Sequence, residues 1–332
     1  MKILGSNVAI RLVISLLSVL LVSQVRADSC PEVNHEALAW LDKMSHSARE
    51  VSYQGVVTFQ LGDDMQVMQI SHSVDTAGTS ESLTQLTGQG ARVTRINHPL
   101  DCIHPGHKLL RLSEDIRAGA RLPGTTGPQD CGIAGHYQFS VLEGERIAGR
   151  KAIRIIIEAR DMYRYGYVME LDKKTGLLLK ERTIGRGDKV LERFQFANIS
   201  YTNENIPTDS VDVVHHASHP ERKAHTGVEP SVDHYPAALW NPLWLPKGFM
   251  STDDASNSAK RRTYTDGLAV FSVFLEILPR DIQPGEGVVR HGGTTSYTRG
   301  IRIDSKPALI TVIGEVPVNT ARMVADSVRW VQ

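Results

Sequence analysis

The sequence predicts an α+β protein in which a curled antiparallel sheet under one helix is followed by a smaller α+β domain. Alternating apolar and polar residues recur in short runs from about residue 51 to 201, separated by Gly/Asp turns. This pattern is typical of antiparallel hairpins with one solvated face. One amphipathic helix precedes these runs, and further strands with a short final helix follow a polar interruption. A length of 332 residues suits two domains.

Residues 1–27 are predicted to be a cleaved secretory signal peptide. Lys2 and Arg11 precede an apolar stretch, and Val25 and Ala27 occupy the −3 and −1 positions of a cleavage site. The stretch is shorter than the about 20 residues that a membrane span needs, although an uncleaved anchor remains the alternative. We therefore expect an exported protein that resides in the periplasm.

The composition excludes several classes of protein. Hydrophobic residues make up 41% and charged residues 22% of the chain, which are ordinary values for a folded soluble protein. Lys+Arg and Asp+Glu both number 37, so no overall field would recruit a nucleic acid. A single long apolar run, at the N-terminus, excludes a multispan transporter.

The first domain is expected over residues 28–202. A helix is predicted at about 31–50, because Ala37, Leu41 and Met44 recur at helical spacing and define one apolar face. Period-two alternation predicts strands over 51–61 and 64–74. Further strands are expected at about 81–87, 90–97, 107–112, 137–148, 151–160, 166–173, 177–184 and 188–201. A meander of eight to ten strands must curl or close.

Residues 203–235 are predicted to be a linker, and residues 236–332 a small α+β domain. The linker contains five histidines but no accompanying metal-ligand motif, so a solvated segment is the favoured interpretation. Trp240 and Trp244 could contact a partner, but packing in the core of the second domain is favoured. Strands are expected near 261–265, 268–278, 294–303 and 308–314, with a helix near 320–330.

The apolar strand faces of the first domain form the candidate binding site. Such residues would line the concave side of a curled sheet, where methionines make an adaptable wall. They could enclose a cavity for acyl chains or fill an ordinary core, and the sequence leaves both open. The candidates are Phe59, Met68, Ile70, Ile155, Ile157, Met169, Phe194 and Phe196.

The chain shows no enzyme signature, and we expect neither a cofactor nor a metal. His291-Gly292-Gly293 is similar to an esterase oxyanion loop, but the GxSxG nucleophile motif is absent from the sequence. Among the cysteines, Cys102 and Cys131 are candidates for a disulfide that closes a loop in an exported protein, with unpaired thiols as the alternative. Cys30 would be left over.

Several motifs together resemble the MucB/RseB family in both domains. Each motif is weak by itself, but their order and spacing along the chain make the resemblance specific. In the first domain they are Ser52-Tyr53-Gln54-Gly55, Arg164-Tyr165-Gly166-Tyr167, 171–177 (LDKKTGL) and 191–196 (LERFQF). In the second domain they are 244–249 (WLPKGF), 264–273 (YTDGLAVFSV) and 312–317 (VIGEVP).

The resemblance implies a regulator of an envelope-stress sigma factor. Members bind the periplasmic domain of a single-span anti-sigma factor and hinder its proteolysis. The first domain would be a half-open β-barrel similar to lipoprotein carriers, with a helical lid over an apolar cavity. Acyl chains of lipopolysaccharide or lipoproteins would enter that cavity and weaken the complex. The disulfide and the His-rich linker are not attributed to the family as a whole.

The sequence leaves three points open. The resemblance assigns no partner-contact residues one by one, so these are unknown. The sequence leaves a homodimer open. A periplasmic lipid or lipoprotein carrier without a regulatory partner is the alternative function, because it would use the same cavity.

Overall fold

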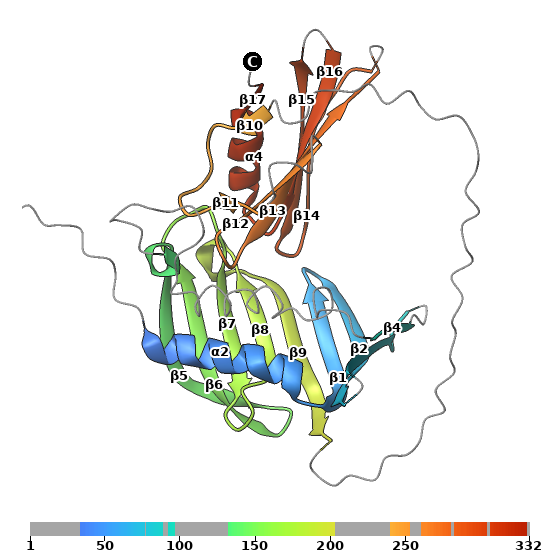
Figure 1. Ribbon diagram of the computed structural model, residues 1–332, viewed down its shortest axis with the longest axis vertical. Coiled ribbons are helices and arrows are strands. Elements are labelled where there is room, and N and C mark those ends of the chain that lie inside the picture. The colour runs from blue at the N-terminus through green and yellow to red at the C-terminus, as the bar shows by residue number, and fades with distance from the viewer. Residues whose placement is uncertain are drawn as a thin grey trace, which may run out of the picture.

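Two large antiparallel sheets, each covered by a helix on one face, and a small two-stranded sheet make up the described part of the chain (Figure 1). The structure is a computed structural model. It describes residues 34–76, 78–88, 92–96, 132–202, 240–252, 260–279, 282–303 and 306–330.

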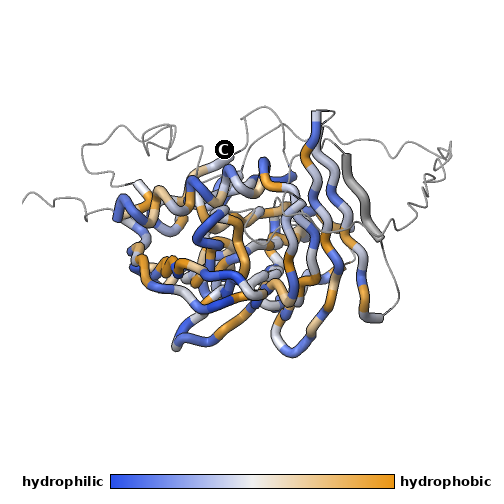
Figure 2. Tube along the Cα trace, turned by 90° about the horizontal axis from the view of Figure 1, so that it is seen from below, coloured by the Kyte–Doolittle hydropathy of each residue, from blue (hydrophilic) through white to orange (hydrophobic). Residues whose placement is uncertain are grey.

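The first sheet has nine strands. They are β1 (Tyr53–Leu61), β2 (Asp64–Asp75), β3 (Gly78–Gln85), β4 (Arg92–Ile96), β5 (Tyr137–Ile147), β6 (Arg150–Ala159), β7 (Gly166–Asp172), β8 (Leu178–Ile184) and β9 (Val190–Tyr201). Figure 2 shows hydrophobic and hydrophilic residues interspersed along the extended segments of the coloured trace. Tyr53, Ile155 and Met169 belong to the buried set and are 1% exposed or less. The predicted curled antiparallel sheet is confirmed.

The order of the strands differs from the simple meander that the sequence predicts. It is β4-β3-β2-β1-β9-β8-β7-β6-β5, so two meanders are joined by pairing of the first and last strands. Tyr53 pairs with Tyr201, and Phe59 with Phe194. Strands β4 and β5 are the two edges, so the sheet of described strands is not closed. Local alternation cannot fix a pairing between strands so far apart in sequence.

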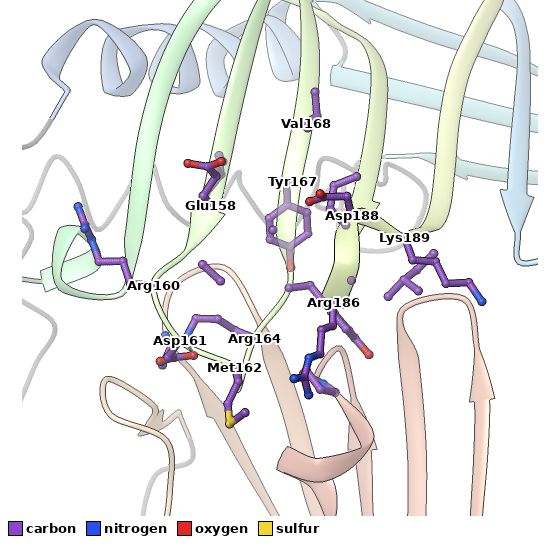
Figure 3. A pocket seen from close by; sticks show the side chains of 18 of the residues that line it. Glu158, Arg160, Asp161, Met162, Arg164, Tyr167, Val168, Arg186, Asp188 and Lys189 are labelled. Carbon is purple, nitrogen blue, oxygen red and sulfur yellow. Dashed lines mark hydrogen bonds and ion pairs between the residues drawn. The ribbon is translucent and has the colours of Figure 1, made fainter.

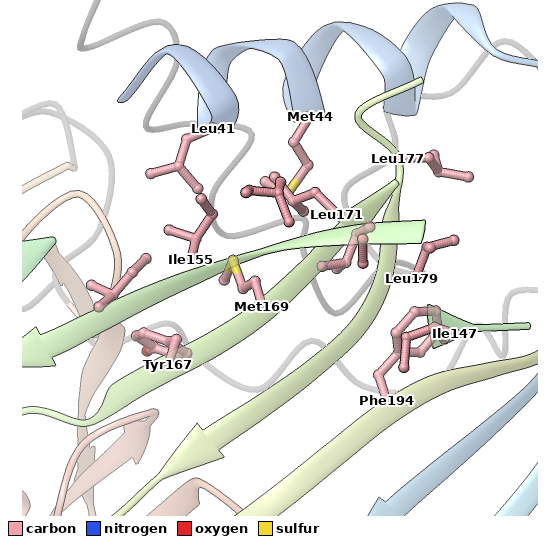
Figure 4. Packing of buried hydrophobic residues seen from close by; sticks show 14 of the residues in the cluster. Leu41, Met44, Ile147, Ile155, Tyr167, Met169, Leu171, Leu177, Leu179 and Phe194 are labelled. Atoms are coloured by element: carbon pink, nitrogen blue, oxygen red, sulfur yellow. The ribbon is translucent and has the colours of Figure 1, made fainter. Parts of the chain in front are cut away.

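Helix α2 (His35–Glu50) covers the inner face of the first sheet. It begins where the side chain of Asn34 accepts a hydrogen bond from the backbone N–H of Ala37, a standard N-cap. Leu41 and Met44 are each 1% exposed, and burying such a side chain stabilises a fold by about 1.5–3 kcal/mol. Figure 4 shows both pointing from the helix toward the strands. The predicted helix is therefore the lid of this domain.

The turn between β7 and β8 holds the C-terminal half of α2. Lys43 Nζ donates to the carbonyls of Lys173 and Lys174 at 3.3 and 3.1 Å. Ser47 Oγ donates to the carbonyl of Thr175. Gly176 has a φ of +88°, and a Cβ there would lie 2.7 Å from Cγ of Lys43. The turn and the helix fit closely because this position is glycine.

The second domain has a six-stranded sheet with the order β11-β12-β13-β16-β15-β14. The strands are β11 (Met250–Ser251), β12 (Arg261–Thr265), β13 (Val270–Ile277), β14 (Glu286–His291), β15 (Thr294–Ile303) and β16 (Lys306–Gly314). Helix α4 (Val318–Ser327) packs on one face through Ala321, Val324 and Ala325. Strands β10 (Trp240–Pro242) and β17 (Val328–Trp330) form a separate pair.

Two expectations for the second domain need correction. The final helix ends at Ser327, and the chain continues as β17, in place of a helix to residue 330. Strand β14 was not predicted, because both of its faces are exposed and it therefore lacks the alternation of a half-buried strand. The other predicted strands of this domain are confirmed within a few residues.

Candidate functional site at the domain junction

The eight candidate cavity residues all belong to, or pack against, one hydrophobic cluster in the first domain. The buried ones are Ile70, Ile155, Ile157, Met169, Phe194 and Phe196, and the partly buried ones are Phe59 and Met68. Ile155 lies opposite Met169 on neighbouring strands. The rings of Phe194 and Phe196 meet edge to face at 5.4 Å. The apolar face therefore lies beneath α2, and binding of a lipid there stays a prediction.

The loop between β6 and β7, residues 160–165, joins the first domain to the second. Tyr165 Oη donates to the carbonyl of Val316 at 3.1 Å. Thr320 Oγ1, on α4, donates to the carbonyl of Tyr163 at 2.9 Å. These two hydrogen bonds connect the β6–β7 loop of the first domain to helix α4 and to the segment between β16 and α4 in the second domain.

Arg164 lies at the centre of this junction, with its side chain fully buried. One guanidinium nitrogen donates to Asp266 Oδ2 at 2.5 Å, and the other to the carbonyl of Lys247 at 2.7 Å. Nε donates to both carboxylate oxygens of Asp161 at 3.1 Å. The guanidinium also lies 5.2 Å from the ring centroid of Phe249, a cation–π distance. Arg164 thus contacts three separate segments of the chain.

The carboxylate of Asp266 accepts four hydrogen bonds. Its Oδ1 accepts from the backbone N–H groups of Leu268 and Ala269 at 3.0 and 2.8 Å. Its Oδ2 accepts from Tyr137 Oη at 3.0 Å in addition to Arg164. Burial raises the pKa of Asp266, and the positive charge of Arg164 opposes that shift. A buried ion pair of this kind is costly to break, because the remaining charge has no solvent to stabilise it.

His136 is a second buried titratable group at the junction and is 5% exposed. Burial lowers its pKa below the usual value, and the charges of Arg164 and Lys247 lower it further. Asp266 and Asp161 act in the opposite direction without reversing the shift. The buried site therefore favours the neutral form of His136. At low pH, protonation favours conformations in which the domains separate and His136 is exposed to solvent.

Gly248 of the second domain packs directly on this histidine. Its φ is +89°, and a Cβ at this position would lie 2.0 Å from Nε2 of His136. Any other residue would be strained and would also collide with the ring. The two domains can approach this closely only because the position is glycine.

Two further contacts join the domains at either side of Arg164. The backbone N–H of Gly293, in the turn between β14 and β15, donates to Glu192 Oε1 at 2.8 Å. Tyr163 and Trp244 meet edge to face, with ring centroids 5.2 Å apart. Trp240 lies in the core of the second domain, which confirms the favoured interpretation of that tryptophan.

A cleft of about 1010 Å³ opens at this junction. It is formed by the ends of β6 and β7, the β6–β7 loop, the turn at η2 (Arg186–Asp188) and, from the second domain, Arg290 and residues 317–319. Figure 3 shows its charged side chains. The cations that line it are Arg160, Arg164, Arg186, Lys189 and Arg290, and the acids are Glu158, Asp161 and Asp188. Because Arg164 is buried in its ion pair with Asp266, four cations and three acids remain, so the cleft carries a small positive excess that suits an acidic ligand.

Sequence reasoning did not identify the junction. Arg164 and Asp266 are 102 positions apart and carry no spacing that marks an ion pair. Both do occur within the motifs that carry the family resemblance. The available signal was a run of charged and aromatic residues in a short connection, where an ordinary hairpin needs only turn residues.

Some predicted features lie outside the described residues. These are the disulfide candidates Cys102 and Cys131, the His-rich linker, the strand at 107–112 and residues 1–27. Within the described ranges, no group of three or more His, Cys, Asp or Glu residues could hold a metal ion. No helix in this part of the structure has the length and apolarity needed to span a membrane.

Comparison with known proteins identifies the family. A profile of the MucB/RseB N-terminal domain matches residues 36–215, and a profile of the MucB/RseB C-terminal domain matches residues 235–329. The chain belongs to the MucB/RseB family. Both profiles occur in the order that the sequence motifs indicate, so the predicted resemblance is confirmed.

Relatives in this family are named as sigma factor regulators. The sigma factor AlgU regulatory protein MucB of Pseudomonas aeruginosa is 30% identical over 312 residues, which cover 89% of this chain and 91% of that protein. The sigma-E factor regulatory protein RseB of Haemophilus influenzae is 24% identical over 298 residues, covering 87% and 90%. These names describe regulatory proteins, not enzymes.

Solved MucB structures share the fold of this chain. MucB in complex with MucA(peri) matches with a TM-score of 0.64 at 27% identity, covering 89% of this chain and 99% of that one. A crystal structure of MucB matches with a TM-score of 0.53 at 30% identity, covering 89% and 98%. Both matches cover the two domains of this chain, so the two-domain fold of MucB is also the fold of this chain.

Proposed function

We propose that this chain is a periplasmic regulator that binds the periplasmic domain of a single-span anti-sigma factor. By covering that domain it hinders the regulated proteolysis that would release the envelope-stress sigma factor. The observation that carries the proposal is the similarity over 89% of the chain to MucB solved together with MucA(peri). The protein acts by binding and not by catalysis.

The junction supports this role, because partner binding by two domains needs a fixed relative orientation. Arg164, Asp266 and His136 hold the domains together through buried contacts. We assign an acidic segment of the partner to the cleft that both domains line. The four cations there that are not buried in the Arg164–Asp266 pair outnumber the three acids and favour negatively charged side chains.

Charge reversal in the cleft tests this assignment. Arg186→Glu and Lys189→Glu should each weaken binding of the anti-sigma domain about tenfold, mainly by slowing association, and the loss should shrink at high salt. Lys173→Glu, in the β7–β8 turn away from the cleft, is the matched control. Equal affinities for all three variants and the parent protein would place the partner elsewhere.

Lipid binding in the first domain completes the proposed regulator. The acyl chain of a lipopolysaccharide or lipoprotein enters the apolar cluster beneath α2, and each buried methylene contributes about 0.8 kcal/mol. Ile155, Met169 and Phe196 are all 0% exposed, so a chain can enter only if α2 or its neighbours move. Lipid and partner then favour different conformations, and a coupling of roughly 1–3 kcal/mol changes partner affinity 5–150-fold.

The decisive experiment measures the affinity of residues 28–332 for the periplasmic domain of the anti-sigma factor from the same genome, with and without short-chain lipopolysaccharide. Tight binding that weakens with lipid is the expected result. Tight binding without a lipid effect would support protection of the anti-sigma domain but contradict lipid sensing. Absence of binding would contradict the proposed regulatory function.

Substitutions in the apolar cluster separate the two functions of the chain. Ile157→Glu or Phe194→Glu should abolish the lipid response, because a buried carboxylate opposes entry of an acyl chain. Partner affinity in the absence of lipid should stay the same if the domain still folds, which circular dichroism checks. An unchanged lipid response would show that the lipid binds elsewhere.

A lipid or lipoprotein carrier without a regulatory partner is the second candidate. It is favoured by the fact that the eight candidate residues all lie within the first domain, between residues 59 and 196. Such a carrier would transfer a fluorescent lipid between vesicles at a rate that the anti-sigma domain does not alter. The regulator requires that the anti-sigma domain and the lipid compete.

The proposal also includes self-association of the chain as a homodimer. This association needs no anti-sigma factor, so it can be measured on the purified protein alone.

A further inference from the structure

Strand β14 is the outer strand of the six-stranded sheet, and all six of its residues are exposed. Val288 is 52% and Val289 68% exposed. Successive side chains of a strand point to opposite faces, so an apolar side chain is exposed on each face. Among the described residues, β14 pairs only with β15. Its other edge therefore carries backbone N–H and C=O groups that no described strand satisfies.

The strand is already ordered for pairing. At one end, the turn from β14 to β15 is held by the bond from the Gly293 N–H to Glu192 of the first domain. Near the other end, Tyr297 Oη donates to Glu286 at 2.7 Å. A strand fixed in this way loses little further conformational entropy when another strand adds to it.

The edge lacks three features that commonly prevent such pairing. Exposed edge strands are often blocked by proline, lysine or a bulge, and also by other charged side chains, which β14 does carry. Residues 286–291 read Glu-Gly-Val-Val-Arg-His and contain neither proline nor lysine. The pairing of β14 with β15 runs over all six residues without a register shift. The free edge is thus regular along its whole length.

The charges along β14 indicate what would pair with it. Glu286, Val288 and Arg290 are two positions apart and share one face. If a second copy of the strand runs antiparallel with Val288 opposite Val288, then Glu286 lies opposite Arg290 of the second copy, and Arg290 opposite Glu286. A register centred on Glu286 or on Arg290 would place like charges opposite each other, which is destabilising. The register centred on Val288 is the one that places Glu286 of each copy opposite Arg290 of the other.

We propose that β14 is a homodimerisation edge, on which two copies of this chain pair antiparallel about Val288. The two six-stranded sheets then continue into each other across a twofold axis, and the contact is isologous. The inference rests on the self-association included in the proposed function and not on binding of the anti-sigma factor. One strand pair buries a small area, so the dimer is a weak one that forms at high concentration or when the chains are gathered on a common partner.

Charge reversal tests the pairing on the full mature chain by sedimentation velocity over a concentration series. Each single reversal, Glu286→Arg or Arg290→Glu, places like charges opposite each other at both ends of the contact. Either should raise the dimer dissociation constant about tenfold or more. The double variant, E286R with R290E, restores opposite charges and should recover the dimer. A parent chain that is monomeric at all concentrations, or a double variant as weak as the single ones, would overturn the inference.

Cysteine crosslinking tests the register. In a background with the three native cysteines replaced by serine and its fold checked by circular dichroism, Val288→Cys should form a disulfide with its own counterpart. Directly opposed residues of antiparallel strands have Cα atoms about 4.5–5.5 Å apart, within the range of a disulfide. Val289→Cys is the matched control, because Val289 is more exposed than Val288 but lies opposite Gly287. Crosslinking of Val289→Cys as fast as Val288→Cys would overturn the register.

Binding of the anti-sigma domain, measured on Glu286→Arg, distinguishes this inference from the proposed function, because Glu286 does not line the cleft whereas Arg290 does. Unchanged partner affinity of Glu286→Arg together with a weakened dimer supports β14 as a homodimer edge. If the parent chain stays monomeric and Glu286→Arg weakens partner binding, the edge belongs to the partner and the inference is wrong. Loss of partner binding in every variant, including the parent, contradicts the proposed function and leaves the dimer measurement intact.

Discussion

Replacement of Arg164 by methionine should be the most damaging single change at the junction. The guanidinium and the carboxylate of Asp266 are both 0% exposed, and their atoms meet at 2.5 Å. Methionine fills much of the volume but leaves Asp266 buried as an uncompensated charge, and Lys247 loses the donor to its carbonyl. Removing one partner of a buried pair typically costs about 3–5 kcal/mol. We expect Arg164→Met to lower the free energy of unfolding by that amount.

Urea unfolding measures this loss. With an m-value of about 1–3 kcal/mol per molar, the midpoint should fall by more than about 1 M. Far-UV circular dichroism reports the unfolding of both domains. Tryptophan fluorescence reports mainly the unfolding of the second domain, where Trp240 is buried. Lys173→Ala is the control. Its ion pair with Glu143 is 36% and 82% exposed, so its loss should cost less than about 1 kcal/mol.

A double variant distinguishes a buried charge from simple loss of packing. Adding Asp266→Asn to Arg164→Met removes the unpaired charge, so the double variant should be more stable than Arg164→Met alone. The asparagine oxygen still accepts from the N–H groups of Leu268 and Ala269. If Arg164→Met unfolds at the midpoint of the Lys173→Ala control, or if the two substitutions simply add, the electrostatic account of the junction is wrong.

Three further outcomes are expected. Because the pKa of His136 is lowered in the folded protein, its contribution to stability is complete above the unfolded-state value of about 6.5 and is lost as pH falls below it. His136→Gln should flatten the decline in melting temperature between pH 7.5 and 5, and an unchanged slope would show that other groups cause it. Gly248→Ala should destabilise the junction by more than about 1 kcal/mol through its positive φ and its clash with His136, and a melting temperature equal to that of the parent would contradict this geometry. Ser47→Ala removes the bond from α2 to Thr175 and should cost about 0.5–1.5 kcal/mol while increasing lipid affinity, whereas a decrease would mean that α2 does not gate the cluster.

Much of the first domain could be predicted from local pattern. Alternation along β6, β7 and β9 placed Ile155, Met169 and Phe194 on one face, and the structure brings them into one cluster. The spacing of Leu41 and Met44 likewise placed the buried face of α2. These predictions succeed because side-chain direction repeats every two residues in a strand and every 3.6 in a helix, whatever the strand pairs with.

The junction could not be predicted in the same way. Arg164 and Asp266 occur in two turns of different domains, and Gly248 shows its role only when His136 is placed against it. Such contacts depend on where two sheets meet, which local periodicity does not encode. The same holds for β14, whose regular pairing with β15 leaves both faces exposed and so leaves no alternation to detect.

By itself the sequence determined the fold class, the apolar face of each element and the family, because these follow from short-range periodicity and from motifs in a fixed order. Only the tertiary structure decided that β1 pairs with β9, that a buried ion pair joins the domains and that a basic cleft opens beside it. The physical reason is the range of the interactions. Side-chain alternation is settled within a few residues, whereas pairing of distant strands and burial of opposite charges are settled only when the whole chain packs.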